Sequence, residues 1–289
     1  MSSSSASGTE TETAAAGGGR EIASGKLVLD EPAEHVTRIR IVNPVKRGAL
    51  DHEILDALRD TIRGLESRCV IITGHDPVFS AGYDIGNFPE HTFGGEAVAF
   101  SDAAEKLVAH PFTEAIEAIE DYEYPVIAAI NGHAIGGGLE LAITCDIRIA
   151  ARGVKMGMPP AKIGLIYAYT GLRKFIEVCG IGNTSELFYV GRNVDADRAY
   201  EMGLVNQVVE PSEIEETAVA VAAEIGRNSP LSLRGNKEIM RTLRRTLGGL
   251  PESESRRLVR LRESCFTSGD FVEGIRAFAE KRPARWSGR

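Results

Sequence analysis

A glycine-rich stretch with one carboxylate carries the strongest chemical signal in the sequence, between Val126 and Asp146. Val126 to Ile130 is an apolar run of strand type, and the residues from Leu139 onward suit a buried helix. Gly136 to Gly138 lie at the joint, where the absence of a Cβ lets backbone N–H groups face a ligand oxygen. Glu140 follows inside the apolar helix, where burial is costly unless the carboxylate is paired, near water or used. The stretch predicts a strand-to-helix joint that holds a negatively polarised oxygen beside a carboxylate.

A second stretch, Val78-Phe-Ser-Ala-Gly-Tyr-Asp-Ile85, combines with the first into a recognisable pattern. The run from Asn131 to Asp146 resembles the signature of the crotonase (enoyl-CoA hydratase/isomerase) superfamily, and Val78 to Ile85 resembles that family's other oxyanion-hole segment. The resemblance extends, with gaps, from about Lys26 to Trp286. It implies that the backbone N–H groups of Tyr83 and Gly137 hold a thioester carbonyl as it becomes an enolate. Each such donor contributes roughly 3–4 kcal/mol to a transition state.

The same resemblance implies an acyl-CoA substrate, with coenzyme A entering as part of the substrate and no separate cofactor or metal expected. The loop from Asn43 to Leu50 matches the family's CoA-contacting loop, and its basic pair is a candidate partner for phosphate. The closing segment matches a region of the family where a Phe and a Lys of a neighbouring subunit often reach the nucleotide. The candidate CoA contacts are Lys46, Arg47, Ala49, Ala81, Phe278 and Lys281.

The stretch from Met156 to Gly171 departs from the pattern of ordinary hydratases. Those enzymes use two glutamates around one water, the first matching Glu140 and the second falling where this chain has Pro160. Proline has no titratable group and no backbone N–H, so it cannot substitute. The stretch instead resembles the methylmalonyl-CoA decarboxylases, which have a proline there and a tyrosine matching Tyr167. Loss of CO2 requires enolate stabilisation and no general base, and Tyr167 would hold the departing carboxylate by a hydrogen bond.

The predicted function is therefore an acyl-CoA enzyme that decarboxylates methylmalonyl-CoA or a related malonyl-type thioester, a carbon–carbon lyase with Tyr83, Gly137, Tyr167 and Glu140 at its catalytic site. Two alternatives stay open at this point. One is an enoyl-CoA hydratase or isomerase that relies on Glu140, and the other is an acyl-CoA binding protein without turnover. Glu140 is either an acid or base on its own, a group kept protonated by burial, or a side chain that points away from the pocket.

Composition narrows the range of partners. The chain has 289 residues, a formal net charge of −8 and a pI near 5.4, which argues against nucleic acid as its main partner. Its four cysteines are widely spaced and are expected to be reduced core residues. No apolar stretch has the length of a membrane span and no signal-peptide core precedes the first strand, so no membrane partner and a cytoplasmic location are expected.

The predicted organisation has three parts. Residues 1–25 have too few apolar residues to offset the entropy lost on ordering, and they are expected to be a disordered tail. Residues 26–210 alternate strand and helix patterns, which predicts an α/β core with a mostly parallel sheet, and the resemblance implies repeated ββα units. Residues 211–289 have helical patterns throughout, and the resemblance implies that this region supports a homotrimer or a dimer of trimers.

Overall fold

A seven-stranded sheet forms the centre of the structure, a computed structural model that describes residues 19–84, 111–247 and 249–288. The sheet has the order β1-β2-β3-β4-β6-β8-β11 and is parallel from β3 to β11, with the antiparallel β1 and β2 at one edge. The strands are β1 Arg20–Ile22, β2 Leu27–Ala33, β3 Val36–Ile41, β4 Cys69–Gly74, β6 Val126–Ile130, β8 Ile147–Ala151 and β11 Gln207–Val209.

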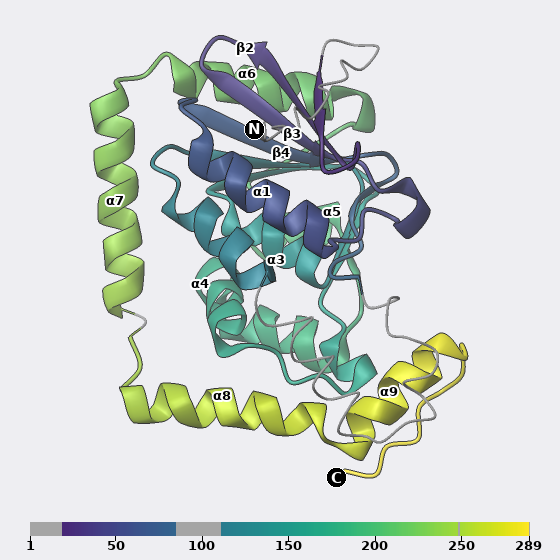
Figure 1. The fold of residues 1–289 in the computed structure, drawn as a ribbon. Coiled ribbons are helices and arrows are strands. Elements are labelled where there is room, and N and C mark those ends of the chain that lie inside the picture. The colour runs from purple at the N-terminus through teal and green to yellow at the C-terminus, as the bar shows by residue number, and fades with distance from the viewer. Residues whose placement is uncertain (1–18, 85–110, 248, 289) are drawn as a thin grey trace, which may run out of the picture.

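Helices cover both faces of this sheet. Every residue of β4 and β6 is buried, as expected for parallel strands enclosed on both sides. Figure 1 shows the sheet between α1 (His52–Gly64) and α6 (Ile214–Gly226). α1 buries Ile54, Leu55, Leu58 and Ile62 at helical spacing. Its N-cap is Asp51, whose carboxylate accepts a hydrogen bond from the Ile54 N–H at 3.0 Å.

A second, four-stranded sheet has the order β10-β9-β7-β5. Its strands are β5 Val78–Ser80, β7 His133–Ile135, β9 Lys155–Gly157 and β10 Val194–Asp195. β5, β7 and β9 each follow directly on a strand of the central sheet, which confirms the expected crotonase-like α/β fold of repeated ββα units. The sequence predicts a loop from Gly74 to Gly82, but Val78–Ser80 forms β5, because a strand of three residues is too short to show an alternating pattern.

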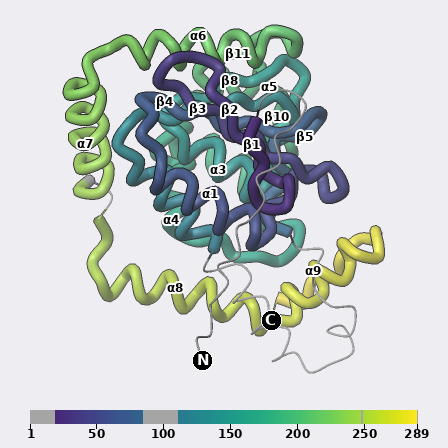
Figure 2. Tube along the Cα trace, turned by 45° about the horizontal axis from the view of Figure 1, so that its top comes forward, coloured from purple at the N-terminus to yellow at the C-terminus, as the bar shows by residue number. Residues whose placement is uncertain are grey.

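The remaining helices follow the second sheet. α3 (Gly137–Thr144) and α4 (Tyr169–Ser185) lie beside the site described below, and α5 (Ala196–Glu201) precedes β11. Past α6, α7 (Pro230–Leu247) and α8 (Glu252–Phe266) run along the outside of the core before α9 (Gly269–Ala279), as Figures 1 and 2 show. No helix in the described ranges is long and apolar enough to cross a membrane.

The structure corrects two predicted boundaries. Residues 20–25 do not belong to a disordered tail, because Arg20–Ile22 pairs with β2 and a tight turn follows; residues 1–18 lie outside the described ranges. The core does not end at residue 210 either, since α6 buries Ile214, Ala218 and Ala222 against the central sheet. The sequence also predicts a flexible segment from Gly86 to Gly95 and a helix from about Ser101 to Asp121. Residues 111–121 are helical, and the other residues of these two segments lie outside the described ranges.

Candidate active site

The backbone N–H groups of Tyr83 and Gly137 lie close together, where the loop after β5 approaches the start of α3. Tyr83 forms a parallel bridge with Leu50, in which the N–H of Leu50 donates to Gly82 at 2.8 Å and the N–H of Asp84 donates to Leu50 at 3.2 Å. Because backbone groups alternate along an extended chain, the N–H of Tyr83 points to the other side. There it lies 3.3 Å from the position that a Cβ on Gly137 would occupy. The predicted pair, Tyr83 and Gly137, is therefore brought together.

The close approach of α3 to β5 depends on Gly138. A methyl group at this position would lie 2.3 Å from the carbonyl oxygen of Ser80 and 2.7 Å from its Cβ. Any side chain at Gly138 would therefore push the start of α3 away from the β5 loop. The N-terminal end of α3 also carries partial positive charge from its unpaired N–H groups, which favours an oxyanion beside Gly137.

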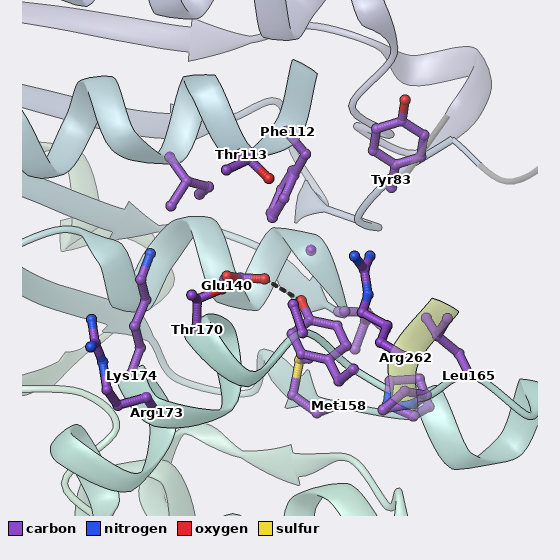
Figure 3. Close-up of a pocket in the computed structure, with 18 of the residues that line it drawn as sticks. Tyr83, Phe112, Thr113, Glu140, Met158, Leu165, Thr170, Arg173, Lys174 and Arg262 are labelled. Carbon is purple, nitrogen blue, oxygen red and sulfur yellow. Dashed lines mark hydrogen bonds between the residues drawn. The ribbon is translucent and has the colours of Figure 1, made fainter. Parts of the chain in front are cut away.

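The carboxyl group of Glu140 lies in the wall of the pocket, in the first turn of α3. The hydroxyl group of Tyr167 donates a hydrogen bond to its Oε2 atom (Figure 3). Burial raises the pKa of Glu140, while the positive charge of Lys174 and the hydrogen bond from Tyr167 oppose that rise. Lys174 is itself buried and pairs with Glu120 at 2.9 Å. Glu140 points into the pocket, which leaves an acid–base role open to it.

Tyr167 reaches Glu140 because a glycine faces both side chains. A methyl group at Gly171, in the first turn of α4, would lie 2.8 Å from Oε1 of Glu140 and 2.7 Å from the Tyr167 ring. Burial raises the pKa of Tyr167 well above its usual range, and the Glu140 carboxyl adds to the rise. The hydroxyl group of Tyr167 therefore stays protonated and acts as a donor to Glu140, a role that differs from the predicted contact with a departing carboxylate.

These groups share one pocket of about 630 Å³. Tyr83, Gly137, Glu140 and Tyr167 all line it, and Figure 3 shows the Tyr83 ring directed away from Glu140, so that the backbone of Tyr83 faces the site. The lining combines apolar and polar side chains. The apolar residues include Met158, Pro160 and Leu165, and the polar ones include Thr113, Glu120, Thr170 and Lys174.

The candidate CoA contacts fall into two groups. Lys46, Arg47 and Ala49 lie beside the β5 loop, where the N–H of Ala81 donates to the carbonyl of Arg47 at 3.1 Å. The ammonium group of Lys46 lies 2.5 Å from Oδ2 of Asp84, and Arg47 is exposed. Ala81 lines the pocket from this side and Ala49 is buried.

The second group comes from α9 and the turn after it. Phe278 lines the pocket from its own chain, whereas the sequence comparison with the family assigned it to a neighbouring subunit. Lys281 is exposed beyond the end of α9 and is not among the residues that line the pocket.

Comparison with known proteins decides the family. The sequence profile of the enoyl-CoA hydratase/isomerase family matches residues 31–289. The chain belongs to that family. It is 32% identical over 262 residues to a short-chain-enoyl-CoA hydratase of Clostridium acetobutylicum, covering 88% of this chain and 95% of that protein. It is also 32% identical over 269 residues to a crotonyl-CoA hydratase of Syntrophomonas wolfei, covering 90% and 97% of the two chains.

Among solved structures, a methylmalonyl-CoA decarboxylase in complex with 2-nitronate-propionyl-CoA has a TM-score of 0.81 and 27% sequence identity, covering 91% of this chain and 99% of that one. This likeness fits the expected resemblance within the enoyl-CoA hydratase/isomerase family. The predicted carbon–carbon lyase activity is nevertheless wrong, because the relatives at about 32% identity are named enoyl-CoA or crotonyl-CoA hydratases. Tyr167, which that prediction assigned to the departing carboxylate, donates its hydrogen bond to Glu140.

Several pocket residues of this family member were not predicted from the sequence. Phe112 and Thr113 come from the helix at 111–121, Lys174 from α4, and Arg262 from α8. Nothing in the local sequence separates these residues from ordinary helix residues, since their role follows from how the helices pack. Within the described ranges, no group of three or more His, Cys, Asp or Glu side chains comes together as a metal site.

Proposed function

We propose that this protein adds water to the double bond of a 2-enoyl-CoA thioester, and in reverse removes water from the 3-hydroxyacyl-CoA, with Glu140 as its acid–base group. The proposal depends on the position of the Glu140 carboxyl group. This group is buried in the pocket wall, accepts a hydrogen bond from Tyr167 and lies one helical turn from the N–H of Gly137. The likeness to hydratases at about 32% identity supports this reaction type. The reaction uses only the thioester and water, so it needs no separate cofactor.

The geometry suggests how the steps would run. The N–H groups of Tyr83 and Gly137 stabilise the enolate oxygen that forms as water adds to C3. The Glu140 carboxylate takes the proton of that water while the C3–O bond forms, and the resulting carboxylic acid then gives a proton to C2. Tyr167 donates a hydrogen bond to one oxygen of the Glu140 carboxylate and so orients this side chain. The other carboxylate oxygen can then accept the proton of the water. Because Pro160 supplies no second carboxylate, one carboxyl group both removes and returns a proton.

The direct test is hydration of crotonyl-CoA, followed by the loss of absorbance of the conjugated thioester. Glu140→Gln keeps the size of the side chain and removes the base, so we expect the rate to fall about 10²- to 10⁴-fold. Glu216→Gln, an exposed change on α6, is the matched control and should leave the rate unchanged. A parent enzyme that binds crotonyl-CoA and turns over neither it nor its 3-enoyl isomer would favour a binding protein. Equal rates in the parent and Glu140→Gln would exclude Glu140.

We also propose that the chain assembles as a trimer or a dimer of trimers. α7 docks on the core through basic residues, with Lys237 on Asp146 at 2.8 Å and Arg245 on Asp121 at 2.6 Å. Its outer face and that of α8 expose large apolar side chains, which favours association. These are Leu231, Ile239, Met240, Leu243, Val259 and Leu261. A stable, active monomer in light scattering at micromolar concentration would contradict this proposal.

A further inference from the structure

Glu140 must carry a negative charge to act as a base, although its surroundings disfavour that charge. The residue is 6% exposed, and burial is the largest influence on its pKa, which it raises. A buried carboxylate is costly unless an opposite charge lies near it. The site therefore needs a counter-charge for the proposed first step, in which Glu140 takes a proton from water.

Lys174 lies where such a counter-charge would act. Gly171 faces the carboxyl group from α4, since a methyl group there would lie 2.8 Å from Oε1 of Glu140, and Lys174 follows three positions later on the same helix face. Its ammonium group lies 3.4 Å from Oγ1 of Thr144, which donates a hydrogen bond to the backbone carbonyl of Glu140 at 2.8 Å. Lys174 is 4% exposed and lines the pocket together with Glu140. The ammonium group is thus held against the part of α3 that carries the proposed base.

Glu120 fixes the ammonium group in this place. Its Oε1 atom lies 2.9 Å from Nζ of Lys174, and it reaches the pocket from the helix at residues 111–121. The negative charge of Glu120 also acts on Glu140, raising its pKa where the charge of Lys174 lowers it. The ion pair therefore joins two charges that have opposite effects on one carboxyl group.

We propose that Lys174 is a positioning residue that keeps Glu140 in its charged form, and that Glu120 holds Lys174 in place and limits its effect. This inference rests on the proposed hydration, because it explains how a buried Glu140 starts the reaction as a base. The other groups that act on Glu140 are the Tyr167 hydroxyl, from the loop before α4, and the Arg262 guanidinium, from α8, and both favour the charged form. Lys174 has the strongest effect of the three.

The ion pair has one competing role, as a structural tie between α4 and the helix at residues 111–121. Loss of a tie would lower activity or stability whichever partner is replaced, and it would leave the pH dependence of the rate in place. Loss of a counter-charge moves that pH dependence, and the two partners move it in opposite directions.

The turnover test follows the pH–rate profile of crotonyl-CoA hydration. Lys174→Met removes the positive charge, so we expect the acidic limb to move up by about one pH unit and the rate below it to fall about 10-fold. Glu120→Gln removes the charge that limits Lys174, so the limb should move to lower pH. Lys155→Met, an exposed change on β9, is the matched control. Unmoved limbs, or shifts of the same sign in both variants, would overturn the inference.

A titration without turnover separates this inference from the proposed function. The carboxyl stretching band of Glu140, isolated in infrared spectra as the difference between a protein and its Glu140→Gln variant, shows the pH at which this group ionises. In Lys174→Met it should ionise at higher pH than in the parent, even if crotonyl-CoA is not hydrated. Lys174→Gln keeps a hydrogen-bond donor for Glu120 without the charge, so it should show the same shift if methionine disturbs the fold. If crotonyl-CoA is hydrated but Glu140 ionises at the same pH with and without the charge of Lys174, the inference is overturned and the proposed function stands.

Discussion

The glycine joint at the start of α3 and the C-terminal helices α7 to α9 both contribute to the pocket, but different forces hold them. The joint is enclosed by the second sheet and by β6, and backbone atoms pack there so closely that a side chain has no room at Gly138. α7 docks through charged side chains and exposes apolar ones. The groups proposed to stabilise the enolate lie in the enclosed region, whereas Arg262 and Phe278 of the C-terminal helices line the same pocket.

The sharpest test of this contrast places the same substitution in each region. Gly138→Ala should destabilise the fold by about 1–3 kcal/mol, because its methyl group would lie 2.3 Å from a backbone oxygen. The displaced N–H of Gly137 should also lower hydration by about 10²-fold. Gly235→Ala, in α7, meets no atom within 4 Å and should stabilise the protein by up to about 1 kcal/mol. Urea unfolding of both variants measures the difference. Equal effects would mean that the joint is no more tightly packed than α7.

A second substitution separates activity from stability inside the enclosed region. Gly171→Ala adds a methyl group 2.7 Å from the Tyr167 ring and 2.8 Å from Oε1 of Glu140, so both side chains must shift while the backbone stays in place. The Glu140–Tyr167 hydrogen bond should break while the fold remains, so we expect crotonyl-CoA hydration to fall by about 10²-fold. The free energy of unfolding should fall by less than in Gly138→Ala, because side chains can shift where a backbone oxygen cannot. Retention of full activity in steady-state kinetics would show that Glu140 does not need its present position.

Tyr167 connects the two regions, because its loop is held by Cys265 of α8 and its hydroxyl group is held by Glu140 of α3. Tyr167→Phe removes a hydrogen bond to an ionisable group, which should raise the activation free energy by about 1.5–3 kcal/mol. We therefore expect kcat to fall by roughly 10- to 100-fold. That bond lowers the pKa of Glu140, so its loss should move the acidic limb of the pH–rate profile to higher pH. A slower enzyme with an unchanged profile would mean that Tyr167 acts on the substrate and not on Glu140.

Much of the enclosed region could be predicted from the sequence, because its patterns are local. The apolar run, the glycines and Glu140 follow one another within Val126 to Asp146, and each constrains the backbone directly. The pairing of Tyr167 with Glu140 joins positions 27 residues apart, and Arg262 reaches the pocket only through the packing of α8. The hydrophobic period of a helix or strand gives no information on contacts between residues so far apart in the sequence. The wrong reaction type came from this gap, since Tyr167 was assigned to the substrate before its partner was known.

The smallest expected effect concerns two glutamates whose pKa values move in opposite directions. Burial raises the pKa of Glu140 above its ordinary value of 4.5, whereas hydrogen bonds from Arg282 lower the pKa of Glu273 on α9 to about 2. As the pH rises above 4.5, Glu140 ionises first in the unfolded chain, so its contribution to stability is lost as the pH passes through its raised pKa. Glu273 behaves in the reverse way, stabilising the fold above pH 4.5 and losing that contribution as the pH falls toward 2.

Glutamine does not titrate, so replacing either glutamate with glutamine removes the pH dependence that this glutamate adds to the stability of the fold. Relative to the parent, Glu140→Gln should melt at an increasingly higher temperature as the pH rises above 4.5, because only the parent loses stability as Glu140 ionises in its unfolded chain. Glu273→Gln should be less stable than the parent at pH 7 and should approach it as the pH falls below 4.5, with a small amplitude because this ion pair faces solvent. Thermal unfolding across the pH range gives both slopes, with Glu216→Gln, an exposed change on α6, as the control variant. Slopes of the same sign would mean that Glu140 is not held in the buried environment that its proposed acid–base role requires.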